Sequence, residues 1–278
     1  MPELPDLIYI QKKLSDKIIG KEITDIKVRN PIIIRNLLNG DINDILSGLT
    51  FKTLALKGHF LLMELDKIHI VVNFMLSGKF QYQQKNEKPG KYLCMSFKMD
   101  DGNTLNYLDN KQMGKIYFSQ KENFEKIPGL MDQGIDILSA DFDIDNFKRL
   151  IKKKKNQIRA FLMDHTLLSS IGNAYADEIL FDARIHPKTF CNRLSEEKIT
   201  ELYESIKKVM LWGIEMVDKA DQPIEVKVRE HLKVRNRKNE QCPVCGSTIR
   251  RESVLGYDTF YCPTCQPPSR KHFISWES

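Results

Sequence analysis

The apolar residues near the start of the chain recur at helical spacing. They are Leu7, Ile10, Leu14 and Ile18. Side chains three or four positions apart share one face of a helix, and a glycine commonly follows a helix end. Because Gly20 comes directly after this pattern, the sequence predicts a helix from Pro5 to Ile18.

Beyond this helix the pattern changes to short segments of β character. The expected strands cover residues 22–28, 51–56, 59–65, 68–74, 92–99, 104–108 and 115–118. Only Asp66 and Lys67 separate the third from the fourth, a spacing typical of a tight hairpin. Many short strands at such intervals indicate a sandwich or barrel.

The periodicity becomes helical after Pro128 and Gly129. Apolar positions at helical spacing cover residues 147–162 as one segment and 199–210 as another. Between them, residues 169–173 read as a turn into a further helix, with Ser170 or Asn173 as its N-cap. A polar linker and a small cysteine-bearing module follow. The expected domains are therefore 1–130, 131–234 and 235–278.

Composition and charge narrow the class of protein. The 278 residues are 41% hydrophobic and 29% charged, which is ordinary for globular domains and excludes disorder, collagen and coiled coil. No apolar run reaches the roughly 18 residues that a membrane span needs, and the N-terminus lacks a signal-peptide pattern. We therefore expect a soluble, cytoplasmic protein.

The net charge of +6 does not identify a partner, but its distribution is informative. Residues 147–159 carry seven basic side chains and no acidic one, and residues 227–238 carry six with only Glu230 interrupting. Such runs either form solvated surfaces or bind nucleic-acid phosphates.

Four cysteines form the motif that is most specific from spacing alone. Cys242-Pro-Val-Cys245 and Cys262-Pro-Thr-Cys265 are two Cys-x-x-Cys pairs separated by sixteen residues. This spacing is typical of zinc ribbons, and four thiolates complete a tetrahedral Zn²⁺ site with no position left for substrate, so the zinc would be structural. Disulfides or redox dithiols are the alternative. The remaining Cys94 and Cys191 read as structural thiols.

The chain begins Met1-Pro2-Glu3-Leu4-Pro5. Removal of Met1 would expose a secondary amine at Pro2, and an α-amino group titrates near pH 8, so part of it is unprotonated at neutral pH. Such an amine can attack an electrophilic sugar carbon, and Glu3 beside it can exchange protons. A Pro-Glu start alone is not specific, so its interpretation depends on the other motifs of the chain.

Three motifs occur together and in order. They are the Pro2-Glu3-Leu4-Pro5 start, Phe161-Leu-Met-Asp164 followed by Gly172-Asn173-Ala-Tyr175-Ala-Asp-Glu178, and Phe260-Tyr-Cys262-Pro-Thr-Cys265-Gln266. In this combination the chain closely resembles the formamidopyrimidine-DNA glycosylase and endonuclease VIII family of base-excision repair enzymes. The likeness spans nearly the whole chain, and only the residues after Gln266 look additional.

The resemblance implies an α+β multidomain fold: an N-terminal helix with a β-sandwich, a helix–two-turns–helix domain and a C-terminal zinc ribbon. It implies that Pro2 attacks C1′ of a damaged nucleotide flipped out of double-stranded DNA. Glu3 would assist opening of the sugar, and β- and δ-elimination would then cut the strand. A monomer, associated with the nucleoid if the source is bacterial, is the family expectation, and no membrane partner is expected.

The resemblance also assigns DNA-backbone contacts. Asn173 matches a phosphate-binding asparagine, although a plain helix cap is its alternative role. Lys155 matches a lysine that approaches the backbone, and Asn73 lies where a histidine that contacts phosphate is usual. Contacts of this kind position the protein without reading bases.

Several departures from the family pattern bear on activity. A lysine that usually reaches the DNA near the lesion is His59 here, and Lys57 would share its face and could supply the missing charge if the strand extended that far. Both are therefore candidate catalytic residues beside Pro2 and Glu3, and a sheet-surface histidine is the alternative for His59. The residues that fill the gap left by the flipped base are Leu76, Lys111 and Met113, with core packing the alternative for Leu76. Tyr257 replaces a ribbon arginine.

Two further differences concern the lesion. The stretch from Val217 to Gln241 looks shorter than in members specific for 8-oxoguanine, and Asp6 replaces a glutamate. We therefore expect oxidised pyrimidines, ring-opened purines or bulky lesions as substrates. A DNA-binding protein that recognises damaged or abasic DNA with little or no chemistry is the alternative function.

Overall fold

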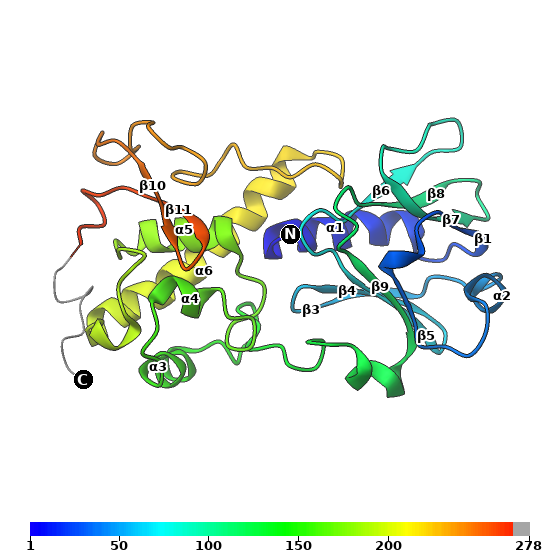
Figure 1. The fold of residues 1–278 in the computed structure, drawn as a ribbon, viewed down its shortest axis with the longest axis horizontal. Helices are drawn as coiled ribbons and strands as arrows, with labels where there is room; N and C mark the ends of the chain where they lie inside the picture. The colour runs from blue at the N-terminus through cyan, green and yellow to red at the C-terminus, as the bar shows by residue number, and fades with distance from the viewer. Residues whose placement is uncertain (269–278) are drawn as a thin grey trace. The chain divides into compact units, whose positions relative to one another are not determined.

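The computed structural model describes residues 1–268 (Figure 1). It divides into two compact units. The N-terminal unit comprises Met1–Asp132 and Val217–Val228, and the C-terminal unit comprises Gln133–Met216 and Arg229–Ser278. Most of the predicted extension after Gln266 lies outside the described residues. The predicted boundaries at 130 and 234 remain predictions.

The N-terminal unit starts with helix α1 (Leu4–Ile18), which ends before Gly20 as predicted. Two sheets follow. One has the strand order β1 (Ile23–Val28), β7 (Leu93–Met99), β8 (Thr104–Leu108) and β6 (Lys79–Gln83). The other has the order β2 (Ile34–Asn36), β9 (Lys115–Gln120), β5 (Ile68–Asn73), β4 (Phe60–Leu65) and β3 (Thr53–Lys57).

One hydrophobic core joins α1 to both sheets. It includes Leu14 of α1, Phe97 of β7 and Val72 of β5, each fully buried. Figure 1 shows α1 together with strands of both sheets. The predicted helix with a β-sandwich is therefore confirmed. The sequence did not predict the short strands β2 and β6, the short helix α2 (Ile42–Leu46), or the 3₁₀ turns at Pro31–Ile33 and Lys121–Lys126.

Turns between the strands decide where side chains project. Asp66 and Lys67 form the predicted hairpin turn, with Asp66 at φ 53°. Gly58 and His59 form a second two-residue turn, because β3 ends at Lys57 and β4 begins at Phe60. The expectation that a strand starts at His59 is wrong, and the shared face proposed for Lys57 and His59 does not exist.

The C-terminal unit begins with four helices: α3 (Ile144–Lys152), α4 (Ile158–Leu162), α5 (Asn173–Asp182) and α6 (Glu196–Ala220). Residues 147–162, predicted as one segment, form two helices separated by a basic turn. A core of buried aromatic rings, Phe142, Phe147, Phe161 and Tyr203, holds α3, α4 and α6 together. A single 3₁₀ turn, Cys191–Arg193, precedes α6.

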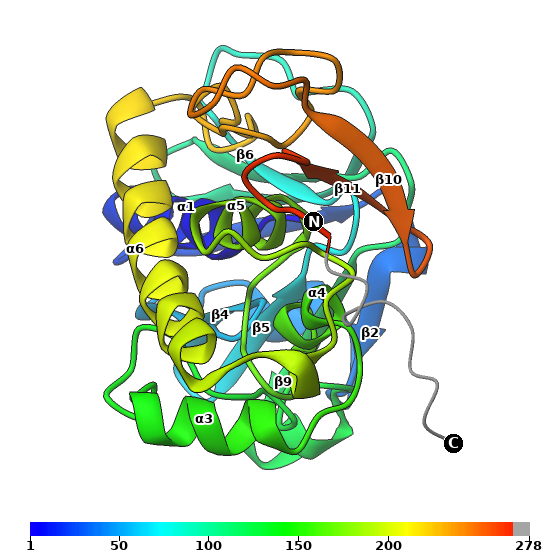
Figure 2. The same ribbon diagram turned by 90° about the vertical axis from the view of Figure 1, so that its left-hand side faces the viewer.

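Helix α5 lies close to α6 because Gly213 has no side chain. A Cβ atom at this position would lie 2.3 Å from the ring of Tyr175, so any other residue would push the helices apart. The hairpin of β10 (Arg250–Val254) and β11 (Tyr257–Tyr261) lies beside α5, as Figure 2 shows. The helical domain and the ribbon hairpin are therefore both present.

The segment after α6 differs from the prediction of a polar linker. Val217 in the last turn of α6, and Ile224 and Val228 in the segment after it, are buried in the core of the N-terminal unit. Tyr9 of α1 donates a hydrogen bond to the carbonyl oxygen of Gln222 at 2.6 Å. The segment is thus a structural part of that unit. None of the helices within residues 1–268 is both long and apolar enough to cross a membrane.

Candidate active site and zinc centre

The start of α1 holds the first two predicted catalytic residues. Pro2 and Glu3 are both buried, and Glu3 is the N-cap of the helix. Its carboxylate accepts the backbone N–H of Asp6, while Asp6 accepts the N–H of Glu3 at 2.8 Å. This reciprocal capping box fixes the Glu3 carboxylate beside the N-terminus and explains what the shorter Asp6 does here.

The terminal amine lies in surroundings that favour its neutral form. The Met1 amino group donates a hydrogen bond to the Leu76 carbonyl at 3.0 Å. Burial first and the Lys227 ammonium second lower the pKa of this group from 8.0 to about 5, against the opposing charges of Glu3 and Asp6. A neutral amine is nucleophilic, so the start of the chain is electrostatically prepared for attack on carbon.

Two cavities of the N-terminal unit adjoin this amine. The larger, of about 390 Å³, is lined by Leu76, Ser77, Gly78, Lys79, Lys91, Tyr92, Leu108, Asp109, Asn110, Glu225 and Lys227. The second is lined by Pro2 and Asp6 together with Gly78, Lys79, Glu225 and Lys227, which also line the first. In the lining of the larger cavity the basic residues Lys79, Lys91 and Lys227 outnumber the acidic Asp109 and Glu225, so the cavity favours anionic groups.

Two loops of the N-terminal unit carry the predicted gap-filling residues. Leu76 is 59% exposed and Met113 is 38% exposed, and Lys111 is also exposed, so Leu76 does not pack in the core. The buried Asp109 carboxylate holds both loops. It accepts hydrogen bonds from Gly114 N at 2.7 Å, from Lys111 N at 3.1 Å and from the Ser77 hydroxyl.

The structure also locates the three remaining predicted residues of this unit. Lys57 Nζ lies 3.3 Å from Met131 Sδ, and the His59 ring stacks on Phe60 with centroids 4.4 Å apart. Asn73 ends β5 and accepts the backbone N–H of Met75 at 3.0 Å, which shapes the turn leading to Leu76. These contacts bring none of the three side chains to the terminal amine.

In the C-terminal unit, Asn173 is the first residue of α5 and not its cap. Gly172 is the N-cap, and no side chain caps the helix. The Asn173 oxygen instead accepts a hydrogen bond from Arg159 at 2.8 Å, which explains why it does not cap the helix. The helix N-terminus still presents backbone N–H groups, which favour anions.

Tyr257 and Lys155 lie near the surface of the same unit. Tyr257 is 50% exposed, and the Arg159 guanidinium lies 5.9 Å from its ring centroid. Lys155 is exposed in the turn between α3 and α4. Part of the basic run is neutralised, since Lys148 and Lys152 pair with Glu196 at 3.7 and 2.5 Å.

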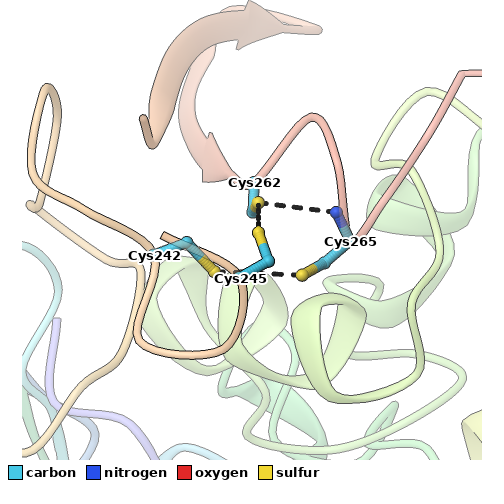
Figure 3. A group of neighbouring side chains, drawn as sticks. All are labelled: Cys242, Cys245, Cys262 and Cys265. Atoms are coloured by element: carbon cyan, nitrogen blue, oxygen red, sulfur yellow. Dashed lines mark hydrogen bonds between the residues drawn. The ribbon is translucent and has the colours of Figure 1, made fainter. Parts of the chain in front are cut away.

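The four cysteines of the ribbon point toward one another (Figure 3). Their sulfur atoms all lie within 4.8 Å of each other, with Cys242 and Cys265 at 3.8 Å and Cys245 and Cys262 at 3.4 Å. A tetrahedral zinc with Zn–S bonds of about 2.3 Å requires sulfur separations of about 3.8 Å. Gly246, at φ 74°, makes the turn around the first pair. The residues therefore fit a structural zinc, which would be held by all four thiolates.

Three residues that the sequence did not identify belong to these sites. They are Lys227 beside the amine, Asp109 beneath the two loops, and Arg159 beneath Asn173. Arg159 lies 14 residues from Asn173, Asp109 lies 32 residues from Ser77, and nearly the whole chain separates Lys227 from Met1. Local sequence patterns carry no signal for such contacts.

Comparison with known families agrees with this architecture. Residues 1–116 match the family model for the formamidopyrimidine-DNA glycosylase N-terminal domain, and residues 133–222 match the H2TH domain of formamidopyrimidine-DNA glycosylase. Residues 239–268 match the zinc finger found in FPG and IleRS.

Similar proteins cover the chain almost completely. A formamidopyrimidine-DNA glycosylase of Bacillus anthracis is 31% identical over 278 residues, covering 96% of this chain and 99% of the relative. That of Pelotomaculum thermopropionicum is 28% identical, with 96% and 99% covered. Lactococcus lactis Fpg, solved in complex with DNA containing an abasic site, has a TM-score of 0.87 at 25% identity, with 96% of this chain and 100% of that chain covered.

A sandwich with a buried Pro-Glu start, a helix–two-turns–helix domain and a four-cysteine zinc ribbon together define a DNA glycosylase of base-excision repair. The chain belongs to the formamidopyrimidine-DNA glycosylase family.

Proposed function

We propose that this glycosylase excises oxidised or ring-opened bases from double-stranded DNA and then cuts the abasic site through Pro2. The observation that carries the proposal is the environment of the terminal amine. Burial and Lys227 hold its pKa well below the ordinary value, and Glu3 is fixed next to it. Pro2 is buried and lines a cavity together with Lys227, so its nitrogen would meet the same burial and the same charge once Met1 had been removed.

The proposed chemistry begins with attack of the neutral Pro2 nitrogen on C1′ of a flipped nucleotide. The glycosidic C1′–N bond breaks, and the base leaves with its electron pair and takes up a proton. Glu3 assists protonation of the ring oxygen, so the C1′–O4′ bond opens and leaves an iminium ion on Pro2. Loss of a C2′ proton then expels the 3′ phosphate, and a second elimination expels the 5′ phosphate.

The remaining predicted residues are proposed as DNA contacts. Leu76, Lys111 and Met113 would fill the gap left by the flipped nucleotide, and the exposure of all three supports this role. Asn73, Lys155, Asn173 and Tyr257 would contact the backbone. His59 and Lys57 are proposed as weaker electrostatic contacts, because their contacts with Phe60 and Met131 do not bring them to the amine.

We also propose that the protein acts as a monomer in the cytoplasm, associated with the nucleoid if the source is bacterial. The mixed charge and the basic turn between α3 and α4 support binding to DNA rather than to a membrane surface. Ring-opened purines are favoured as substrate because Lactococcus lactis Fpg has been solved with DNA containing Fapy-dG.

The test is a panel of duplexes that carry single damaged bases, assayed for base release and strand cleavage. The proposal expects release of at least one ring-opened or oxidised base, with cleavage on both sides of the site. An N-terminally extended variant, in which Pro2 has no free amine, should bind the duplexes and cut none of them. Tight binding by the unextended protein without any cleavage would instead support a binder of damaged DNA.

A further inference from the structure

Arg159 of α4 is the most deeply buried arginine among the described residues of the C-terminal unit, with 1% of its surface exposed. It donates hydrogen bonds to three partners, and its guanidinium also lies 5.9 Å from the ring centroid of Tyr257. Its Nε donates to Asp177 at 3.1 Å, and its Nη2 donates to the Asn173 side-chain oxygen at 2.8 Å and to the Asp258 carbonyl at 3.0 Å. These partners come from helix α5 and from the β11 strand of the ribbon.

The contact with Asn173 determines which way its amide faces. A guanidinium only donates hydrogen bonds, so the atom that meets it must be the amide oxygen. The NH₂ group of the half-buried Asn173 is therefore directed away from Arg159, beside the N-terminus of α5. A side chain in this orientation offers a donor, and a phosphate oxygen needs a donor.

We infer that Arg159 is a positioning residue for DNA binding: it locks the Asn173 amide with its donor toward a backbone phosphate and ties that phosphate site to the zinc ribbon. The inference rests on the proposed contact between Asn173 and phosphate. Burial keeps Arg159 itself off the DNA, so its effect on hydrogen bonding to phosphate passes through Asn173. Its contact with the Tyr257 ring is one of packing, which a methionine at this position retains.

Arg235 is a matched control for Arg159. It also donates to Asp177, at 2.8 Å, and to the Asp258 carbonyl, at 2.8 Å. It has no described contact with Asn173. Either arginine can therefore be replaced while Asp177 keeps the other, so both variants leave the buried carboxylate paired, and only one of them releases the amide.

The experiment measures affinity for a duplex that contains a non-cleavable tetrahydrofuran abasic site. The variants are Arg159→Met, Arg235→Met, Asn173→Ala and the double variant Arg159→Met with Asn173→Ala. Binding is followed by fluorescence anisotropy over a range of salt concentrations, and zinc content and urea unfolding are measured for each protein. Stability effects are thus recorded apart from binding effects.

We expect Arg159→Met to weaken binding about tenfold, as loss of one well-oriented hydrogen bond to a phosphate would. Arg235→Met should weaken binding far less at a comparable loss of stability. Arg159→Met should have no further effect when Asn173 is already alanine. Because the amide is neutral, the slope of log affinity against log salt should stay at the wild-type value.

Three results would overturn the inference. Equal weakening by the two methionine variants would assign a purely structural role to Arg159. Additive effects of Arg159→Met and Asn173→Ala would separate the two residues. A salt slope lower by about 0.9 in Arg159→Met would indicate a direct phosphate contact. Adduct formation through Pro2 is measured independently, so failure of the proposed chemistry would be recognised separately.

Discussion

Asp109 is expected to control both loops that carry the gap-filling side chains, and Asp109→Asn tests this. The carboxylate accepts the backbone N–H groups of Lys111 and Gly114 on different oxygens, and the Ser77 hydroxyl as well. An asparagine has only one acceptor oxygen. Whichever way the new amide turns, its NH₂ group faces one of the two backbone N–H groups.

The loss of stability expected for Asp109→Asn follows from these contacts. Hydrogen bonds to a charged acceptor contribute about 1.5–3 kcal/mol each, and a buried donor left without a partner costs about 1–3 kcal/mol. The Lys111 N–H also contacts the Ser77 hydroxyl oxygen at 3.1 Å, so the new amide should keep its oxygen toward Gly114. With one bond to the carboxylate lost and the others weakened, Asp109→Asn should lower the free energy of unfolding by about 2 kcal/mol. The loops with Leu76, Lys111 and Met113 should also lose order, so affinity for a lesion duplex should fall.

The assay is urea unfolding of the zinc-loaded protein, together with hydrogen exchange at the amides of Lys111 and Gly114. Asp16→Asn is the control, since Asp16 is exposed on α1, and its change should stay within about 0.5 kcal/mol. If Asp109→Asn matched this control in stability, in amide protection and in lesion binding, the assigned role of Asp109 would be wrong.

Three other predictions concern the terminal amine, the zinc ribbon and the contact of Glu178 with the segment before the ribbon. Lys227→Met removes a positive charge beside the terminal amine and should raise the pKa of that amine. The acid side of the pH profile for abasic-site cleavage should therefore move to higher pH in single-turnover assays. An unchanged acid side of the profile would contradict this. Chelation of zinc should unfold residues 239–266 and abolish lesion binding, as zinc content and hydrogen exchange can show; retained protection would argue against structural zinc. Glu178 accepts three backbone N–H groups from residues 233–235 and so anchors the segment that leads into the ribbon. Glu178→Gln should therefore lower the free energy of unfolding in urea by about 2 kcal/mol, while Glu204→Gln, at an exposed position, should change it hardly at all. Equal effects of the two substitutions would refute this role of Glu178.

Elements with strong local patterns were predictable from the sequence. Helix α1, the Asp66-Lys67 hairpin and the cysteine ribbon each depend on spacing within a short segment. Strand β2 is three residues long and pairs in parallel with β9, far away in sequence, so no local pattern marks it. Strand β3 ends before Gly58 because the hairpin turn needs two residues, which hydrophobicity alone does not indicate.

The sites were predictable only in part. The motifs identified Pro2, Glu3 and Asn173, but not the residues that orient them. Burial of Val217, Ile224 and Val228 was missed because polar residues separate them, and with it the approach of Lys227 to the amine. The buried position of Arg159 was missed because it belongs to a basic stretch that is compatible with a solvated surface, whereas its partners come from distant segments.

The proposed chemistry requires the Pro2 nitrogen to form the covalent bond to deoxyribose. The most direct test reduces the protein with borohydride while it acts on an abasic duplex, digests the trapped product and locates the sugar by tandem mass spectrometry. We expect a deoxyribose remnant on the nitrogen of Pro2, in a peptide that lacks Met1. A remnant on a lysine side chain, or on a peptide that retains Met1, would contradict it.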